Sequence, residues 1–320
     1  MIDVLMPATG KPFLDLIFLG LPHIPEPGEE VFADDLVIVP GGMLTSAFTL
    51  HRLGLSVLFE ATLGRDPASS FLLQAMEQEG LSREAVTLDD NVKAHVTVAY
   101  NQQNDRSFLS YSTKTPRPDV SLVQRHQPRA VLMAGLRPCD EMEEILREAK
   151  KFGALRIADS QAHDWTLRDQ PLQTAISLLD VLLCNEREAR LMTEIDDIEQ
   201  AAAALAAIVP VIGLKRGGDG AKVYSSSGEF SLPAIPVETI DSTGCGDNFT
   251  GAFTAALLEG CLINECLAWG NAAGSMAVEA PGGTSRKYTR DELLARVHQH
   301  YGELEGPDPL RMVTLSTDDE

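Results

Sequence analysis

A short segment in the last third of the chain combines glycines, hydroxyl side chains and carboxylates where a helix is expected to begin. The sequence DSTGCGD occupies positions 241–247, and an apolar run at helical spacing follows it over 248–258. The preceding segment, 230–240, is extended in character because its two prolines block a helix. A turn of small residues therefore leads into a helix at this point.

The residue types in this segment suit the transfer of a phosphoryl group to a hydroxyl. Free backbone N–H groups and the positive end of the helix dipole should meet at Gly244, Cys245 and Gly246, an arrangement that binds anions. Asp247, in the first helical turn, supplies a carboxylate that can accept the hydroxyl proton. A glycine-rich helix start with a favourably placed aspartate is the alternative interpretation of the segment taken alone.

Composition and charge limit the class of protein. Of 320 residues, 44% are hydrophobic and 23% charged, which is typical of a soluble globular protein, and the net charge of −21 argues against nucleic acid or an anionic membrane as partner. The five cysteines contain no C-x-x-C pair, which favours a reducing cytoplasm over a disulfide framework. The apolar segment 13–21 is interrupted by Asp15 and follows no basic region, so we expect a cytoplasmic protein without a signal peptide.

Strand-like runs alternate with helical patterns along most of the chain. Strands are expected at 57–63, 130–135, 155–159, 181–184 and 209–215, and helices at 67–79, 140–152 and 186–193. The alternation predicts an α/β fold in which helices cover both faces of a mostly parallel sheet.

Two segments, 13–39 and 94–112, break this alternation. They contain strand pairs with little helix between them, at 31–39 in the first segment and at 94–100 and 107–111 in the second. A ragged sheet edge is one interpretation of them. Beyond Tyr301 the sequence loses periodicity, and 302–320 is expected to be an acidic, disordered tail.

The segment 241–247 resembles the D-x-T-G-x-G-D signature of the ribokinase-like (PfkB) carbohydrate kinase family. Further landmarks of that family follow in the family's order from Gly10 to Gly283. The resemblance implies a three-layer sandwich with a mostly parallel central sheet and a small β-sheet lid over the sugar. The catalytic core would comprise 1–12, 40–93 and 113–301, with lid inserts at 13–39 and 94–112. Lids of this kind often form a dimer contact, so a homodimer through the lid is an expectation to test.

The resemblance assigns four residues to the acceptor. Asp15 would accept hydrogen bonds from sugar hydroxyls, since a carboxylate offers two acceptor oxygens, and Gly41 and Gly42 would let the backbone pass close to the sugar. Thr45 replaces the family's usual asparagine and offers fewer hydrogen bonds, which leaves the identity of the sugar open. Relatives that act on phosphorylated sugars tend to carry lysine after the glycine pair; Met43 stands there, which favours an unphosphorylated acceptor.

A second set of residues corresponds to the nucleotide side of the family's site. Asn185 and Glu188 match an N-x-x-E motif that helps to position Mg²⁺ and the phosphates, although a capped helix start explains the same residues. The turn containing Lys215, Gly217 and Gly220 resembles the one that cradles ATP.

Two more landmarks complete the expected site. Asn271 begins a small-residue segment like that beside the adenine, for which tight helix packing is the alternative interpretation. By analogy, Asp241 and Thr243, with backbone near Gly283, would hold a monovalent cation such as K⁺ beside the anion hole. The seven histidines are scattered along the chain and do not suggest a metal site.

Together these landmarks predict an ATP-dependent sugar kinase in which Asp247 is the base and the N–H groups of Gly244, Cys245 and Gly246 stabilise the transferred phosphoryl group. The acceptor would be an unphosphorylated sugar or sugar acid. One alternative is a nucleoside kinase of the same family, with lid aromatics stacking on the base. The other is a non-catalytic sugar-binding sensor, which could lose the base or the glycine turn, although both are present here.

Overall fold

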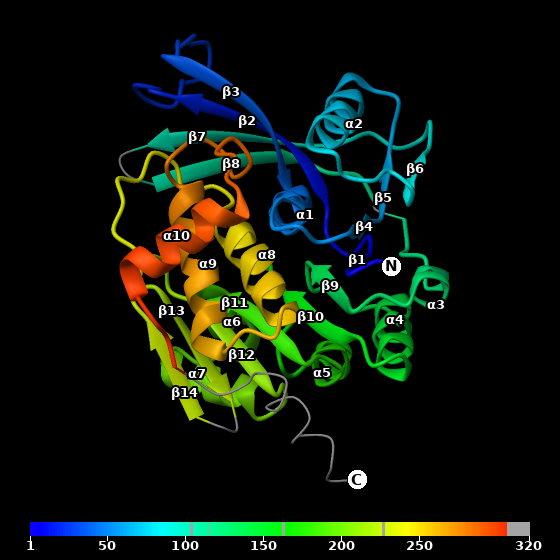
Figure 1. Ribbon diagram of the computed structural model, residues 1–320. Helices are drawn as coiled ribbons and strands as arrows, with labels where there is room; N and C mark the ends of the chain where they lie inside the picture. The colour runs from blue at the N-terminus through cyan, green and yellow to red at the C-terminus, as the bar shows by residue number, and fades with distance from the viewer. Residues whose placement is uncertain (103–104, 115, 162–163, 226–227, 306–320) are drawn as a thin grey trace.

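The computed structural model describes residues 1–102, 105–114, 116–161, 164–225 and 228–305. Its central sheet has eight strands in the order β14-β13-β12-β11-β10-β9-β1-β4 (Figure 1). Their bounds are β1 Val4–Met6, β4 Val57–Phe59, β9 Ala130–Ala134, β10 Leu155–Asp159, β11 Val181–Asn185, β12 Val211–Lys215, β13 Ala221–Ser225 and β14 Gly228–Leu232. All pairs from β12 to β4 are parallel, and β13 and β14 add antiparallel strands at one edge. The predicted α/β fold with a mostly parallel sheet is confirmed.

Helices cover both faces of this sheet, because its inner strands are apolar on both sides. In β9, Ala130 and Leu132 pack in the cluster that includes α1, α8 and α9, whereas Val131 and Met133 pack in the cluster that includes α4, α5 and α7. The helices are α1 Met43–Arg52, α2 Pro67–Glu79, α3 Ser121–His126, α4 Asp140–Lys151, α5 Gln170–Ser177, α6 Glu186–Thr193, α7 Ile198–Ala206, α8 Cys245–Leu258, α9 Ile263–Ala277 and α10 Arg290–Tyr301. Among the described residues, no helix is both long and apolar enough to cross a lipid bilayer.

A separate four-stranded sheet, called the lid below, has the order β3-β2-β7-β8. Its strands are β2 Pro12–Leu19, β3 Asp35–Gly42, β7 His95–Gln102 and β8 Asp105–Tyr111. Figure 1 shows the lid on the side of the core where the segment between α9 and α10 approaches it. The inner face of the lid carries the buried side chains of Asp15, Ile17, Val39 and Ala99; its outer face carries the exposed side chains of Leu36, Ile38, Leu109 and Tyr111.

The structure differs from the sequence-based expectations at several boundaries. The run 57–63 is split between β4 and β5 (Ala61–Leu63), which pairs with β6 (Val86–Leu88) in a small sheet of its own. The chain changes sheet at the buried Glu60, whose carboxylate accepts backbone N–H groups of Ala8 and Asp119. The strand expected at 31–39 begins at 35 and continues to 42, so it includes the glycine pair Gly41 and Gly42. Of the expected tail, 306–320 lies outside the described residues.

Candidate active site

Helix α8 begins in the segment where the sequence predicts an anion site. Gly244 is its N-cap with φ 71°, in the left-handed region that favours glycine. A Cβ atom on Gly244 would lie 2.7 Å from the Cα atom of Gly283, so the close approach of the two loops also requires glycine. No described side chain caps this helix, and the Cys245 N–H makes a long hydrogen bond of 3.4 Å to the Ser242 carbonyl oxygen. Backbone N–H groups in the first turn of a helix can bind an anion.

A buried asparagine that we did not predict clamps the two glycines together. The Nδ2 atom of Asn248 donates to the carbonyl oxygens of Gly244 (2.9 Å) and Gly283 (2.8 Å). Its Oδ1 atom accepts hydrogen bonds from the hydroxyl groups of Thr49 and Tyr288, both at 2.9 Å. These four bonds fix the start of α8 against the loop that contains Gly283.

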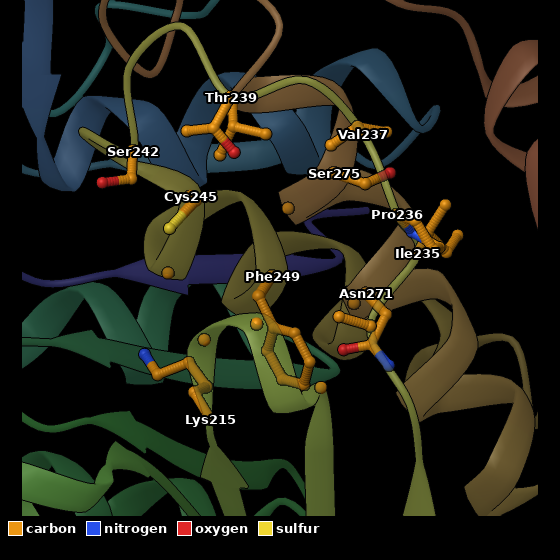
Figure 2. A pocket seen from close by; sticks show the side chains of 18 residues that line it. Lys215, Ile235, Pro236, Val237, Thr239, Ser242, Cys245, Phe249, Asn271 and Ser275 are labelled. Carbon is orange, nitrogen blue, oxygen red and sulfur yellow. The ribbon is translucent and has the colours of Figure 1, made fainter. Parts of the chain in front are cut away.

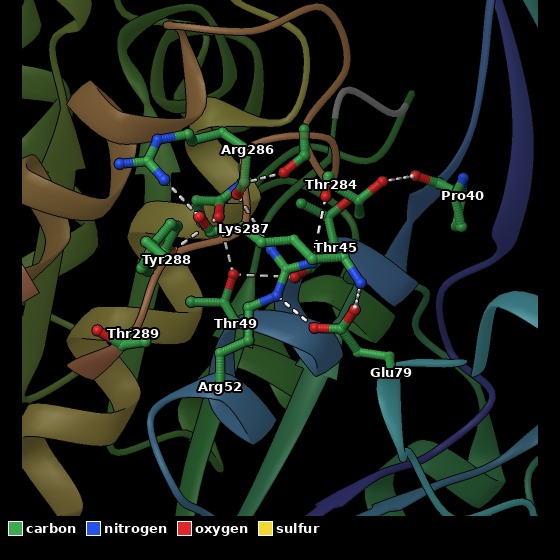
Figure 3. Close-up of polar contacts among 12 residues, drawn as sticks. Pro40, Thr45, Thr49, Arg52, Glu79, Thr284, Arg286, Lys287, Tyr288 and Thr289 are labelled. Carbon is green, nitrogen blue, oxygen red and sulfur yellow. Dashed lines mark hydrogen bonds and ion pairs between the residues drawn. The ribbon is translucent and has the colours of Figure 1, made fainter. Parts of the chain in front are cut away.

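Figure 3 shows how α1 and α2 hold the continuation of that loop. The guanidinium of Arg52 donates to the carbonyl oxygens of Thr284 (3.1 Å) and Arg286 (3.3 Å) and forms a buried ion pair with Glu79. Lys287 also pairs with Glu79, at 3.1 Å. The loop beside the anion site is therefore tied to two helices of the core.

Asp247 lies in the first turn of α8 among several charged groups. Burial and the negative charge of Asp159 raise the pKa of Asp247 to about 7, and Lys215 opposes the rise. Asp15 and Glu188 raise the pKa of Asp247 by smaller amounts. The Asp247 carboxylate is therefore near a residue expected to bind the acceptor, Asp15, and one expected on the nucleotide side, Glu188. A carboxylate with a pKa near neutral pH is matched to accept a proton from a hydroxyl.

Asp159, which we did not predict as a site residue, holds the ammonium group of Lys215 in place. Its Oδ1 atom pairs with Lys215 Nζ at 2.6 Å, and its Oδ2 atom accepts the Thr250 hydroxyl at 2.6 Å. A Cβ atom on Gly246 would lie 3.5 Å from Lys215 Nζ, which places the ammonium group against the start of α8. Burial opposes the charge of Lys215, but Asp159 and Glu188 raise its pKa overall, so the ammonium stays protonated.

A pocket of about 360 Å³ lies beside the start of α8 (Figure 2). The predicted nucleotide residues Lys215, Gly217, Gly220 and Asn271 line it, together with Cys245 and Gly246 from the anion site. The rest of its wall is mostly apolar and includes Ile235, Val237, Phe249 and Val278. Its size and lining suit a flat aromatic ring with phosphates directed toward α8.

Two of the predicted nucleotide residues also have structural roles. The Asn271 amide donates to the carbonyl oxygen of Pro233 and to the hydroxyl of Tyr301, both at 3.1 Å, and so fixes one wall of the pocket. Gly220 has φ +89°, and a Cβ atom there would lie 2.1 Å from the carbonyl oxygen of Leu232. This position therefore requires glycine whether or not a nucleotide binds.

Asn185 and Glu188 form the capping box of α6, as the alternative interpretation of their motif anticipated. The Asn185 N–H donates to the Glu188 carboxylate and the Glu188 N–H to the Asn185 side chain, both at 2.9 Å. Burial raises the pKa of Glu188 to about 7, although Lys215 opposes the rise. Within the described ranges no three or more His, Cys, Asp or Glu side chains cluster as a ready-made metal site.

The residues expected to contact the acceptor come together under the lid. Asp15 is buried on β2, and a Cβ atom on Gly41 would lie 1.8 Å from its Oδ2 atom, so the glycine makes room for the carboxylate. Burial and the charge of Asp241 raise the pKa of Asp15 to about 7. Gly42 has φ +60°, and Thr45, buried in α1, has a hydroxyl without a hydrogen-bond partner among the described residues.

Asp241 joins the loop that contains Thr243 to the loop that contains Gly282 through hydrogen bonds beside the anion site. Its Oδ1 atom accepts the Thr243 N–H (3.0 Å) and hydroxyl (2.8 Å), and its Oδ2 atom accepts the Gly282 N–H (2.8 Å). The carbonyl oxygen of Thr243 lies 3.2 Å from the position that a Cβ atom on Gly283 would take. Carboxylate and carbonyl oxygens thus gather beside Gly244.

Comparison with known proteins agrees with this geometry. The family model described as "pfkB family carbohydrate kinase" matches residues 15–290. The chain belongs to this family, as the sequence resemblance indicated, and is a phosphotransferase that acts on a hydroxyl group.

Several curated relatives match most of the chain. A ribokinase of Haemophilus influenzae is 28% identical over 289 residues, which cover 86% of this chain and 93% of the relative. A fructokinase of Vibrio alginolyticus is 24% identical (82% and 93% covered), and a cytidine kinase of Thermococcus kodakarensis is 26% identical (80% and 93% covered). The relatives therefore include kinases of sugars and of a nucleoside.

Solved structures share the fold. Ribokinase of Arabidopsis thaliana, complexed with ribose and ATP, has a TM-score of 0.78 at 22% identity, with 93% of this chain and 99% of that chain covered. A putative ribokinase II from E. coli, in complex with ATP and Mg²⁺, has a TM-score of 0.78 at 19% identity, with 94% and 100% covered. At these identities the likeness shows a common ribokinase fold.

Proposed function

We propose that this kinase transfers the γ-phosphoryl group of ATP to a hydroxyl of an unphosphorylated sugar or sugar acid. The observation that carries the proposal is the position of Asp247 in the first turn of α8, directly after Gly244, Cys245 and Gly246. The 360 Å³ pocket adjoins this turn, and Asp15 of the lid is close enough to influence the pKa of Asp247. A base, an anion-binding turn and an acceptor carboxylate are thus within reach of one another.

ATP would lie in the pocket with its phosphates toward α8. Lys215, Gly217, Gly220 and Asn271 would bind it, and Asp159 would keep the Lys215 ammonium directed at the phosphates. Two structural neighbours were solved in complex with ATP, which supports ATP as the phosphoryl donor.

Metal ions would add charge neutralisation at the phosphates. Asn185 and Glu188 would hold Mg²⁺ through water, and the ion would supply positive charge to neutralise the phosphates. The capping box keeps the Glu188 carboxylate in one orientation, which suits this role. We also assign Asp241 and Thr243 to a K⁺ ion beside the anion hole, because their oxygens gather where the Gly244 and Gly283 loops meet.

The residues of the chain then divide the chemical work. Asp15, with the backbone at Gly41 and Gly42 and the Thr45 hydroxyl, would hold the acceptor so that one hydroxyl points at Asp247. Asp247 would take the proton of that hydroxyl. The N–H groups of Gly244, Cys245 and Gly246 would stabilise the charge on the phosphoryl group in transit.

The test is ADP release with ATP and Mg²⁺ across unphosphorylated sugars, sugar acids and nucleosides. We expect one acceptor class to give turnover, and Asp247→Asn to reduce kcat by about 10²–10⁴ because the base is lost. The variant should remain folded, since asparagine has nearly the same volume. Near-wild-type turnover in Asp247→Asn would contradict the assignment of the base.

A nucleoside kinase is the second candidate, favoured by the cytidine kinase relative and by two solved nucleoside kinases with the same fold. Phe13 on the inner face of the lid could stack on a base. Turnover of nucleosides but not of free sugars would select this candidate. ATP binding without ADP release from any acceptor would instead favour a sugar-binding sensor.

A further inference from the structure

We propose that the acceptor carries an anionic group, and that Lys11 and Arg137 bind this group at the end of the acceptor site where the lid meets the β9–α4 connection. The inference rests on the proposed kinase function and narrows its acceptor class. The shared chemistry is that of a carboxylate or a phosphate. A sugar acid as the source of the anion agrees with the unphosphorylated acceptor proposed above, whereas a phosphorylated sugar would overturn that part of the proposal.

The first observation is that the Lys11 side chain extends along the inner face of the lid. Phe13 of β2 is directly opposite His95 of β7, and their rings are 5.4 Å apart. Lys11 reaches past this pair, because its Nζ atom donates to the hydroxyl of Ser112, just beyond the end of β8. The ammonium group therefore lies on the same side of the lid as Asp15, which follows Phe13 by two residues on β2.

The second observation is the contact that brings Arg137 to the same place. A Cβ atom on Gly10 would lie 1.8 Å from the carbonyl oxygen of Ala134, and one on Gly135 would lie 3.1 Å from the Cα atom of Gly10. Only glycines allow the β1–β2 loop and the β9–α4 connection to approach this closely. Lys11 and Arg137 follow the two glycines by one and two residues, so the backbone positions from which both side chains extend lie close together.

The electrostatics agree with this geometry. Burial and the positive charge of Arg137 lower the pKa of Lys11. Burial, Lys11 and Arg137 together lower the pKa of His95 to about 4, so this imidazole is neutral at neutral pH. Its Nδ1 atom accepts the Thr113 N–H, which assigns the ring proton to Nε2 as a further donor.

The mutual repulsion of Lys11 and Arg137 raises the free energy of the site, and an anion bound beside Lys11 would lower it. The chain has 47 acidic residues against 26 basic ones, yet among the described residues Lys11 donates to a hydroxyl and forms no ion pair with a carboxylate. An anionic group on the acceptor would offset the repulsion between Lys11 and Arg137 and accept a hydrogen bond from His95. Its hydroxyl groups would then lie toward Asp15 and Asp247.

The test compares matched acceptors that differ only in charge: an aldose, the corresponding aldonic acid and the corresponding sugar monophosphate. ADP release is measured with the wild type and with Lys11→Met, Arg137→Gln and, as a surface control, Lys151→Met. We expect the wild type to prefer an anionic acceptor. Lys11→Met should raise KM for that acceptor by about 10–100-fold, because a charged hydrogen bond is lost, and leave KM for ATP unchanged.

The outcomes separate this inference from the kinase proposal. A preference for the carboxylate identifies a sugar acid, and a preference for the phosphate identifies a phosphorylated sugar. Turnover of the neutral aldose that Lys11→Met leaves unchanged overturns the anion site and keeps the kinase. If no acceptor releases ADP, calorimetric binding of the aldonic acid and the sugar monophosphate decides: an anion that binds the wild type but not Lys11→Met supports the site, and equal binding or none overturns it.

Discussion

Asp247 and Lys215 show how single residues are tuned by neighbours that are distant in sequence. Asp247 alone on a surface helix would be an ordinary acid. Here burial and Asp159 raise its pKa to about 7, while the ammonium of Lys215 opposes the rise. The pKa of the proposed base Asp247 is therefore set in part by the ion pair between Asp159 on β10 and Lys215 on β12.

The pH dependence of turnover should report this balance. Asp247 must be ionised to accept a proton, so kcat/KM should rise with pH and level off above about pH 7. Removing the positive charge in Lys215→Met disfavours the carboxylate, so the midpoint should move upward by about one unit, with a lower plateau. Lys222→Met is the matched control, because Lys222 pairs with Glu199 and Glu229 away from the pocket. An unchanged midpoint in Lys215→Met would contradict the coupling.

The sequence predicted the residues of the site that lie within short motifs. Asp247 and Gly244 could be proposed as site residues because a local spacing indicates their chemistry. Asp159 and Asn248 were missed because their partners are remote: Thr250 is 91 residues from Asp159, and Gly283 is 35 residues from Asn248. An acidic residue at the carboxyl end of an apolar strand was the available signal for Asp159.

At the scale of elements, local patterns predicted the bounds of several helices and strands but not the sheets that the strands join. Helices α2 and α6 and strand β10 begin and end at the expected residues. Splitting of the run 57–63 could not be foreseen, because it depends on Glu60 accepting N–H groups 52 and 59 residues away. Likewise, the close contact of Gly244 with Gly283 depends on Asn248, whose role no local pattern indicates.

Asn248→Ala should therefore weaken both stability and turnover. The substitution removes the side-chain partner of the Gly283 carbonyl oxygen and of the Tyr288 hydroxyl, at a cost of about 2–4 kcal/mol in unfolding free energy. The Gly244 carbonyl oxygen keeps the backbone N–H of residue 248, and the Thr49 hydroxyl keeps the Thr45 carbonyl oxygen. The start of α8 would also lose its fixed position, so kcat should fall more than KM for ATP rises. Urea unfolding and steady-state kinetics measure the two effects.

Tyr288→Phe is the matched control for this prediction. It removes one hydrogen bond to Asn248 and leaves both carbonyl contacts, so it should cost about 1 kcal/mol and change kcat little. Equal losses of kcat in the two variants would mean that the clamp on the glycines is not what positions the anion site.

At the scale of the whole molecule, the outer face of the lid exposes more apolar side chains than a monomer in water usually does. Strand pairing places Ile38, Leu16, Val98 and Leu109 in one row across all four strands. Leu36, Phe18 and Tyr100 form a second row beside it. Two adjacent apolar rows on a solvent-facing sheet indicate a surface that another protein covers.

We propose that a second copy of the chain covers this face, so that the lids of two protomers pack together. The protein should then elute with twice the 34.6 kDa chain mass in light scattering at micromolar concentration. Leu109, with 69% of its surface exposed, and Ile38, with 43%, are the side chains to change. Ile38→Glu combined with Leu109→Glu should give a monomer, because burying two carboxylates in an apolar interface is costly. Phe32→Ser, at an exposed loop residue outside both rows, should leave the dimer intact; a wild type that stays monomeric would exclude this contact.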